Sequence, residues 1–248
     1  MHLYGLIGYP LEHSYSADYF TEKFHREKLP DHKYRLFPLK HIDELKQLIA
    51  SKPELRGLNV TIPYKQSVLQ FLDETDPVAS ETQAVNCLRI GHYPSGLHLR
   101  GFNTDVYGFG EALKPHLKEH HKKALILGTG GSSKAVAYVL EKLHVEYLFV
   151  SRNPATGHQI GYDHLDEKKL QEYLLIINTT PLGMYPDVSG YPPLPYHLTG
   201  KNHLLFDLVY NPEKTPFLKK GEAQGADTVN GLEMFRLQAE RSWQIWNE

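Results

Sequence analysis

The clearest chemistry in the sequence lies in a glycine-rich stretch that reads Gly128-Thr129-Gly130-Gly131-Ser132-Ser133. A short apolar run, 123–127, precedes it, and apolar residues recur at helical spacing over 136–143. A strand, a glycine turn and a helix in this order are the context of a dinucleotide-binding loop. Gly128 would permit the tight turn, Gly130 would let the backbone approach a pyrophosphate, and the helix N-terminus would offer N–H groups to the phosphates. The alternative is a tight turn that precedes a helix and binds nothing.

The residues after the next strand indicate which dinucleotide binds. This strand, 147–150, ends in Ser151-Arg152-Asn153. An NAD site usually places an acidic residue here, about 20 residues past the glycines, to bind the ribose 2′-hydroxyl. A carboxylate would repel a 2′-phosphate, whereas the guanidinium of Arg152 can hold one through paired, charge-assisted hydrogen bonds. The sequence therefore favours NADP over NAD, with a solvated arginine at a strand end as the alternative.

Composition argues against several classes of protein. The 248 residues suggest one or two domains, and the formal net charge of −2 gives no electrostatic case for nucleic acid or an anionic membrane. No apolar run approaches the roughly 20 residues that cross a bilayer, and no signal peptide is recognisable. Cys87 is the only cysteine, and the histidines show no metal-ligand spacing. We expect a cytoplasmic protein with no metal site, no nucleic-acid partner and no membrane partner.

The order of the expected elements indicates an α/β protein. Strands are expected at 3–8, 33–39, 58–63, 84–90, 97–102, 123–127, 147–150, 174–177, 204–210 and 226–229. Helical patterns separate most of them, and a last helix extends over 231–246. The turn Pro94-Ser95-Gly96 predicts a hairpin in the first part of the chain, whose sheet should therefore be mixed.

Most of the unusual polar residues follow the ends of these strands. They lie in the loops after Ile7, Ile62, Phe102, Leu127, Val150, Ile177 and Val209. Because ligands of open α/β sheets bind outside the carboxyl ends of the strands, we expect these loops to form the two lips of a cleft.

In this order, the residues resemble the shikimate dehydrogenase family. The similar motifs are Gly8–Ser16, Asn59–Lys65, Ala84–Asn86, Gly101–Asp105, Asn178–Met184 and Asp207–Pro212. The resemblance implies an α/β fold with an N-terminal mixed-sheet substrate domain, 1–103, and a C-terminal Rossmann-type NADP-binding domain, 104–230. The helix 231–248 would pack back on the first domain. The implied protein is a monomer or a homodimer.

The resemblance also implies an activity, the reversible NADPH-dependent reduction of 3-dehydroshikimate to shikimate in aromatic biosynthesis. Lys65 and Asp105 resemble the catalytic pair, and Ser14 and Ser16 resemble the hydroxyls that hold the substrate carboxylate. Further substrate contacts implied by position are Thr61, Asn86, Tyr210 and Gln238. The implied cofactor contacts are Gly128, Thr129, Gly130, Gly131, Ser132, Ser151, Arg152, Asn153, Thr179 and Gly231.

The residue types suit this chemistry. Hydride transfer to a ketone builds negative charge on oxygen, which a lysine ammonium can stabilise and protonate. A neighbouring carboxylate can orient the lysine and keep it charged. Taken singly, Lys65 could instead be a surface lysine, Asp105 a helix cap, and either Ser14 or Ser16 the cap of the first helix.

The sequence departs from the family pattern in three places. Ala17 replaces the usual proline, Cys87 replaces the usual threonine, and no lysine or arginine follows Arg152 before Lys168. Two alternatives stay open. One is an NAD-using quinate or shikimate dehydrogenase, and the other is a non-catalytic nucleotide-binding relative.

Overall fold

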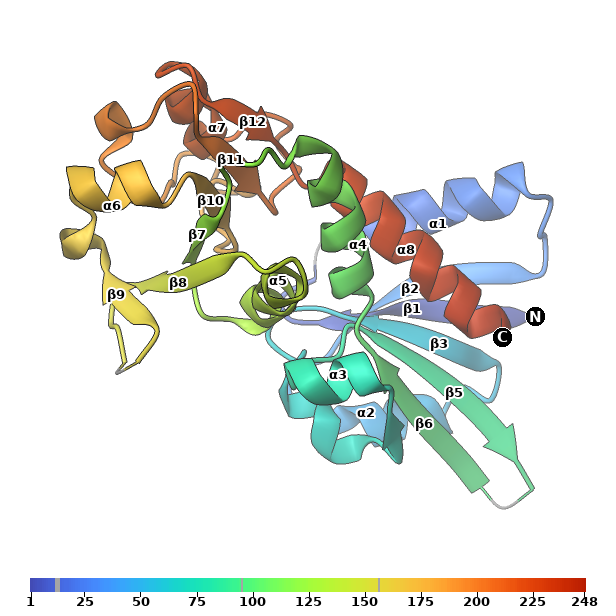
Figure 1. Ribbon diagram of the computed structural model, residues 1–248. Helices are drawn as coiled ribbons and strands as arrows, with labels where there is room; N and C mark the ends of the chain where they lie inside the picture. The colour runs from blue at the N-terminus through green and yellow to red at the C-terminus, as the bar shows by residue number, and fades with distance from the viewer. Residues whose placement is uncertain (12–13, 95, 156) are drawn as a thin grey trace. The chain divides into compact units, whose positions relative to one another are not determined.

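The computed structural model describes residues 1–11, 14–94, 96–155 and 157–248. They form two compact units (Figure 1). Unit 1 comprises Met1–Thr104 and Ala239–Glu248, and unit 2 comprises Asp105–Gln238. The sequence assigns the whole last helix to the first domain, whereas the structure divides it between the units after Gln238. Among the described residues, each unit is built on a six-stranded sheet.

Unit 1 contains the mixed sheet that the hairpin predicted. Its strands are β1 His2–Gly8, β2 His32–Pro38, β3 Leu55–Val60, β4 Glu74–Thr75, β5 Cys87–Tyr93 and β6 Gly96–Phe102, in the order β2-β1-β3-β5-β6-β4. Strand β1 pairs in parallel with β2 and β3, whereas β5 is antiparallel to β3 and β6. The helices are α1 Tyr15–Arg26, α2 Glu44–Ala50 and α3 Pro77–Thr82, with a 3₁₀ turn at Ser67–Phe71.

The end of the chain completes the core of unit 1. The final helix is α8, Leu232–Asn247, and its Trp246 packs against Gly57 so closely that a Cβ there would lie 2.2 Å from the indole nitrogen. That nitrogen donates a hydrogen bond to the carbonyl of Leu88, and the indole stacks on Tyr4 with ring centroids 4.9 Å apart. The last ten residues are therefore part of the fold of unit 1.

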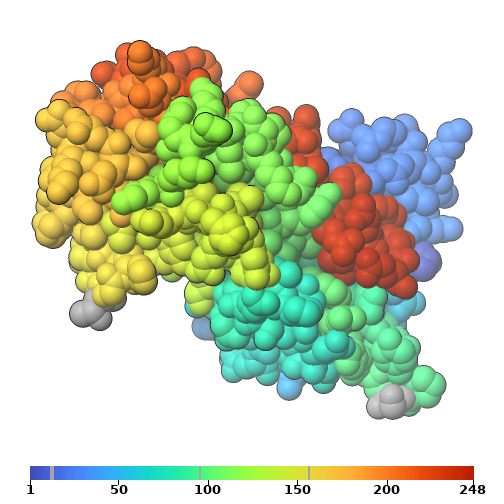
Figure 2. Space-filling view, in the orientation of Figure 1, coloured from blue at the N-terminus to red at the C-terminus, as the bar shows by residue number. Residues whose placement is uncertain are grey.

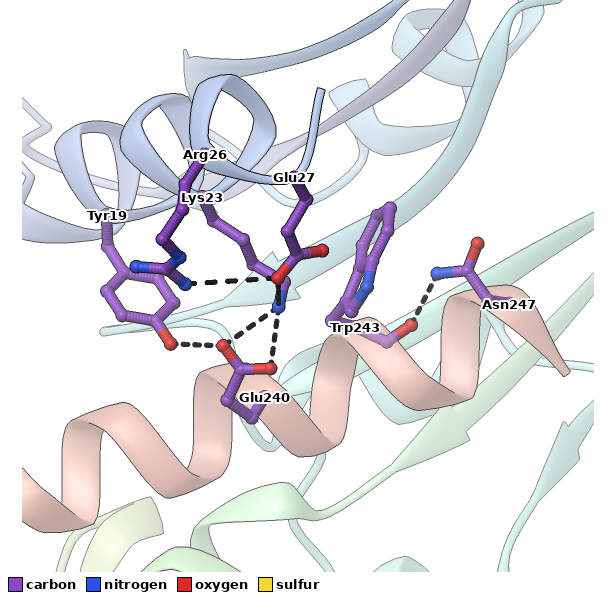
Figure 3. Close-up of polar contacts among 7 residues, drawn as sticks. All are labelled: Tyr19, Lys23, Arg26, Glu27, Glu240, Trp243 and Asn247. Carbon is purple, nitrogen blue, oxygen red and sulfur yellow. Dashed lines mark hydrogen bonds and ion pairs between the residues drawn. The ribbon is translucent and has the colours of Figure 1, made fainter. Parts of the chain in front are cut away.

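A buried ammonium joins α8 to α1 (Figure 3). Lys23 is 3% exposed, and its Nζ lies 2.7 Å from a carboxylate oxygen of both Glu27 and Glu240. The hydroxyl of Tyr19 also donates to Glu240, and the Trp243 ring lies 5.7 Å from the same Nζ. Because a buried charge is costly without partners, this set of contacts constrains how the two helices pack. The space-filling view shows the red end of α8 next to the blue N-terminal segment (Figure 2).

Unit 2 contains a parallel sheet. Its strands are β7 Lys123–Leu127, β8 Glu146–Ser151, β9 Gln159–Gly161, β10 Leu175–Asn178, β11 Leu204–Asp207 and β12 Asp227–Val229, in the order β12-β11-β10-β7-β8-β9. Each neighbouring pair is parallel. The four residues of β10 and of β11 are all buried, as expected for strands covered on both faces.

The helices of unit 2 follow the pattern of the sequence with some differences. They are α4 Thr104–Leu113, α5 Gly131–Lys142, α6 Glu167–Glu172, α7 Pro216–Glu222 and the first part of α8, with 3₁₀ turns at Lys114–His116, Tyr162–His164 and Tyr196–Leu198. Strand β9 was not predicted. It occupies the segment where the sequence shows little helical period, and it pairs with the end of β8. No helix in the described ranges is long and apolar enough to cross a membrane.

Candidate active site

Two of the predicted substrate contacts lie at one edge of the sheet of unit 1. The amide of Thr61 donates to the carbonyl of Ile7 at the end of β1, over 2.9 Å. Asn86 precedes β5, and its carbonyl accepts from the amide of Val60 at the end of β3, over 2.8 Å. Because β5 is antiparallel to β3, its first residue lies beside the last residues of β3. The structure thus places Thr61 and Asn86 beside the ends of β1 and β3.

The two serines begin α1, which follows β1. Ser14 is the N-cap of α1, and its Oγ accepts a hydrogen bond from the amide of Ser16 over 3.2 Å. The capping role considered for Ser14 is therefore present. A hydroxyl that accepts one hydrogen bond can still donate its proton, so capping and ligand binding are compatible. Glu12 and His13, which belong to the same motif, lie outside the described residues.

Lys65 is held close to Asn86 by the backbone. Its carbonyl accepts from the amide of Val85 over 2.7 Å. The preceding residue, Tyr64, is buried, and its hydroxyl donates to the carbonyl of Leu39 over 2.6 Å. These contacts fix the main chain at Lys65, which is partly exposed. The loop therefore places the main chain of Lys65 at the same sheet edge as Thr61 and Asn86.

The amide side chain of Asn86 is oriented by a buried polar network. Its Oδ1 accepts from the amide of Thr104 over 2.6 Å, and its Nδ2 donates to the hydroxyl of Thr104 over 2.9 Å. That hydroxyl also lies 3.1 Å from the hydroxyl of Ser242 on α8, which accepts from Asn59. Ser242 and Asn59 were not among the predicted site residues, because these side-chain contacts join segments far apart in the chain.

In unit 2, Asp105 and Gln238 lie on helices that pack closely together. Asp105 is in the first turn of α4 and is 6% exposed. One turn later, a Cβ on Gly108 would lie 2.6 Å from the carbonyl of Met234 and 2.9 Å from the Cβ of Gln238. Gly108 therefore allows α4 to approach α8 closely between Met234 and Gln238. A glycine inside a helical pattern is the signal that could have predicted this approach.

The glycine turn has the geometry that a dinucleotide requires. Gly128 has a φ of +105°, and a Cβ there would lie 2.9 Å from the hydroxyl of Thr179. Gly130 is the N-cap of α5, and an added Cβ would meet no atom within 4 Å. The protein itself therefore leaves open space at Gly130, as the approach of a pyrophosphate to the backbone requires. Thr129 is exposed beside it, and Gly131 and Ser132 form the first turn of α5.

The segment proposed to select the cofactor begins beside this turn. The amide of Gly128 donates to the carbonyl of Val150 over 2.9 Å, so the end of β8 adjoins the glycines. The amide of Asn153 then donates to the hydroxyl of Ser151 over 3.2 Å, which makes a tight local turn. Arg152 is exposed in this turn. Burial raises the pKa of Tyr162 to about 12, and the charge of Arg152 opposes this shift.

The remaining predicted residues of unit 2 lie after β10 and β11. Thr179 donates its hydroxyl to the carbonyl of Leu127 over 2.7 Å, at the end of β7. The amide of Gly231 donates to the carbonyl of Val209 over 3.2 Å, and a Cβ there would lie only 2.1 Å from the carbonyl oxygen of Leu208. Tyr210 is partly exposed and packs on the ring of Phe235, with centroids 4.9 Å apart.

We also searched the described residues for a metal site and for a hollow near the predicted site residues. No group of histidine, cysteine and carboxylate residues suited to a metal ion occurs in the part of the chain that the structure describes. A hollow of about 540 Å³ lies between α1 and β2, with Phe24, Lys28, Lys33 and Arg35 among its lining residues. It contains none of the predicted site residues.

The parallel sheet and the open glycine turn of unit 2 define a dinucleotide-binding α/β enzyme class, and the comparisons give the family. A profile of the shikimate dehydrogenase substrate-binding domain matches residues 6–88. Shikimate dehydrogenase (NADP(+)) of Desulforamulus reducens is 33% identical over 264 residues, which cover 98% of this chain and 88% of the relative. The chain belongs to the shikimate dehydrogenase family.

Two solved structures are similar over nearly the whole chain. Shikimate 5-dehydrogenase from Thermus thermophilus, in complex with NADP(H) and shikimate, has a TM-score of 0.84 at 29% identity, covering 99% of this chain and 93% of that one. Quinate dehydrogenase from Corynebacterium glutamicum, in complex with NAD, has a TM-score of 0.84 at 27% identity, with the same coverage. The likeness spans both units and includes structures in complex with different cofactors.

Proposed function

We propose that the chain catalyses the reversible NADPH-dependent reduction of 3-dehydroshikimate to shikimate. The observation that carries this proposal is the open glycine turn at Gly130, in a chain that is 33% identical to a shikimate dehydrogenase (NADP(+)) over 98% of its length. In this proposal unit 1 binds the substrate and unit 2 binds the cofactor. The enzyme acts in aromatic amino-acid biosynthesis in the cytoplasm, as a monomer or a homodimer.

The proposed mechanism assigns the proton to Lys65. When bound, the nicotinamide supplies the hydride, and the protein supplies geometry and electric field. The Lys65 ammonium stabilises the negative charge that develops on the ketone oxygen and donates a proton to it. Asp105, a carboxylate in the first turn of α4, orients this ammonium in the proposed mechanism.

The proposed substrate contacts hold a polyhydroxy ring acid at several points. Ser14 and Ser16 bind its carboxylate at the start of α1. Thr61, Asn86, Gln238 and Tyr210 contact its ring hydroxyls. The Asn86 amide is preset by Thr104, which reduces the ordering needed when the substrate binds. Because several residues contact the ring, the substrate should bind in one orientation, with its reacting carbon in a fixed position.

The proposed cofactor contacts follow the strand order. The turn Gly128–Ser132 holds the pyrophosphate, and the segment Ser151–Asn153 holds the adenosine side, with Arg152 on the 2′-phosphate. Thr179 and Gly231, after β10 and at the start of α8, border the other half of the cofactor. The geometry supports this assignment because β8 lies on one side of β7 and β10 on the other.

The test is a steady-state assay of NADPH consumption with 3-dehydroshikimate, and of NADP reduction with shikimate. A second candidate is an enzyme that uses NAD with quinate or shikimate. It is favoured by the absence of a further lysine or arginine between Arg152 and Lys168. Assays with both acids and both cofactors separate the two candidates. Binding of NADPH without turnover would instead indicate a non-catalytic relative.

A further inference from the structure

Asp207 is a fully buried carboxylate at the end of β11 that the proposed mechanism does not use. It is 0% exposed. Its Oδ1 accepts from the Nδ2 of Asn178 over 2.9 Å and from the amide of Val209 over 3.0 Å. Its Oδ2 accepts from the hydroxyl of Thr215 over 2.6 Å. One side chain thus connects the ends of two strands with the N-cap of α7.

Asn178 extends this connection to the loop after β10. Its Oδ1 accepts from the amide of Thr180 over 3.0 Å and from the Thr180 hydroxyl over 2.7 Å. Its carbonyl accepts from the amide of Leu208 over 3.0 Å. Both the oxygen and the nitrogen of the Asn178 side-chain amide are therefore hydrogen-bonded. The bond to Asp207 fixes the orientation of this amide, with its nitrogen toward Asp207 and its oxygen toward Thr180.

The two loops held in this way border the glycine turn and the start of α8. A Cβ on Gly128 would lie 2.9 Å from the Thr179 hydroxyl and 3.1 Å from the Thr180 methyl group. Leu208, on the other loop, packs directly against Gly231. A shift of either loop would therefore change the surface next to the glycine turn, on the side away from β8.

The burial of this carboxylate has an energetic cost. Burial raises the pKa of Asp207 to about 6 despite its hydrogen bonds from Thr215, Val209 and Asn178. Tyr196 is a titratable group whose charge interacts with it. An ionised carboxylate here thus lowers the stability of the fold at neutral pH, and an apolar side chain would not have this effect.

We propose that Asp207 is a positioning residue for the nicotinamide half of the cofactor, acting through Asn178 and the two loops. This inference rests on the proposed function. A dinucleotide spans the carboxyl edge of such a sheet, with one half on each side of the first glycine turn. With Arg152 on the β8 side, the nicotinamide half would be held on the side of β10 and β11, the strands that Asp207 connects.

The test compares two ligands, NADPH and adenosine 2′,5′-bisphosphate, which lacks the nicotinamide half. Asp207→Ala should raise the Kd for NADPH about tenfold, because it removes the acceptor that holds both loops. It should change the Kd for the bisphosphate by less than about twofold. Arg152→Ala should weaken the binding of both ligands, since both carry the 2′-phosphate. Asp166→Ala, which removes an N-cap bond of 2.8 Å in α6 of the same unit, should weaken neither.

Each outcome decides between the alternatives. Equal loss of both ligands in Asp207→Ala, or no loss of NADPH binding, overturns the positioning role. If the wild-type chain binds neither ligand, the proposed function fails instead. Should Asp207→Ala fail to fold, Asn178→Ala interrupts the same connection from the other side, and the same selective loss of NADPH binding is expected.

Discussion

The Nζ of Lys23 lies 2.7 Å from Oε2 of Glu240, which joins α1 to α8 within unit 1 (Figure 3). The lysine side chain is 4% exposed, whereas that of Glu240 is 38% exposed. The two charges therefore respond differently to the loss of their partner. An unpaired carboxylate at this position could be hydrated, but an unpaired ammonium would remain buried.

Removing the charge of Glu240 should lower the free energy of unfolding more than removing the charge of Lys23. We expect Glu240→Gln to lower the free energy of unfolding by about 1–2 kcal/mol, because it leaves the buried ammonium with Glu27 alone. Lys23→Met keeps the apolar stem and should lower it by less than about 1 kcal/mol. Urea unfolding of the two variants measures the difference, and the reverse order would contradict the account.

The contribution of Glu240 should disappear in acid. Burial alone would raise its pKa, but the hydrogen bonds from Lys23 and Tyr19, with the nearby charges, lower it below the ordinary 4.5. A lowered pKa means that the stabilisation is present above the ordinary value and is lost as the pH falls through the folded-state value. The stability difference between wild type and Glu240→Gln should therefore shrink below about pH 4.5. A constant difference down to acid pH would argue against the ion pair as its source.

Asp207 should show the opposite dependence on pH. Its pKa is raised by burial from 3.8 to about 6, so the folded state holds the proton more tightly than the unfolded state. The wild type should therefore lose up to about 3 kcal/mol of stability, relative to Asp207→Asn, as the pH rises from about 4 to about 7. Urea unfolding at a series of pH values measures this change. A difference in unfolding free energy between wild type and Asp207→Asn that does not vary with pH would show that burial does not raise the pKa of Asp207.

Two glycines of the same turn should respond differently to alanine. Gly128→Ala meets a positive φ and the Thr179 hydroxyl at 2.9 Å, so we expect a loss of stability of about 1–3 kcal/mol. Gly130 has a φ of −81° and open space, so Gly130→Ala should fold with normal stability. Its added methyl group should nevertheless raise the Kd for NADPH about tenfold or more, because it occupies the approach of the pyrophosphate. Normal NADPH binding by Gly130→Ala would place the cofactor elsewhere.

Lys65→Ala tests the proposed proton donor. We expect kcat to fall about 10²- to 10⁴-fold with little change in the KM for 3-dehydroshikimate, because the ammonium acts on charge that develops in the transition state. Lys40→Ala, which removes an exposed lysine of the same unit, serves as the control and should leave both constants unchanged. A large rise in KM with a normal kcat would reassign Lys65 to substrate binding.

Much of the fold followed from local patterns. The strand, glycine turn and helix over 123–142 formed as the apolar run and its helical spacing predicted, and the hairpin of β5 and β6 gave the mixed sheet. Strand β9 was missed because its three residues are too few to show a period. The division of α8 between two units was also missed, since one continuous helical pattern gives no sign of it.

The side-chain contacts between distant segments, in the packing of unit 1 and in the candidate site, could not be predicted from local patterns. The pairs Lys23–Glu240 and Thr104–Ser242 are 217 and 138 residues apart, and no local pattern predicts which distant polar groups meet. The motifs supplied the residue types at the strand ends, including Asp207. Only the three-dimensional contacts distinguish a carboxylate that holds two loops from one that contacts a ligand.

In the proposed function, this chain reduces 3-dehydroshikimate with NADPH. The most direct measurement is the rate of NADPH consumption by the purified wild-type chain with and without 3-dehydroshikimate, repeated with NADH. We predict consumption that depends on 3-dehydroshikimate and is faster with NADPH than with NADH. A folded chain that binds NADPH but never oxidises it in the presence of 3-dehydroshikimate would contradict the account.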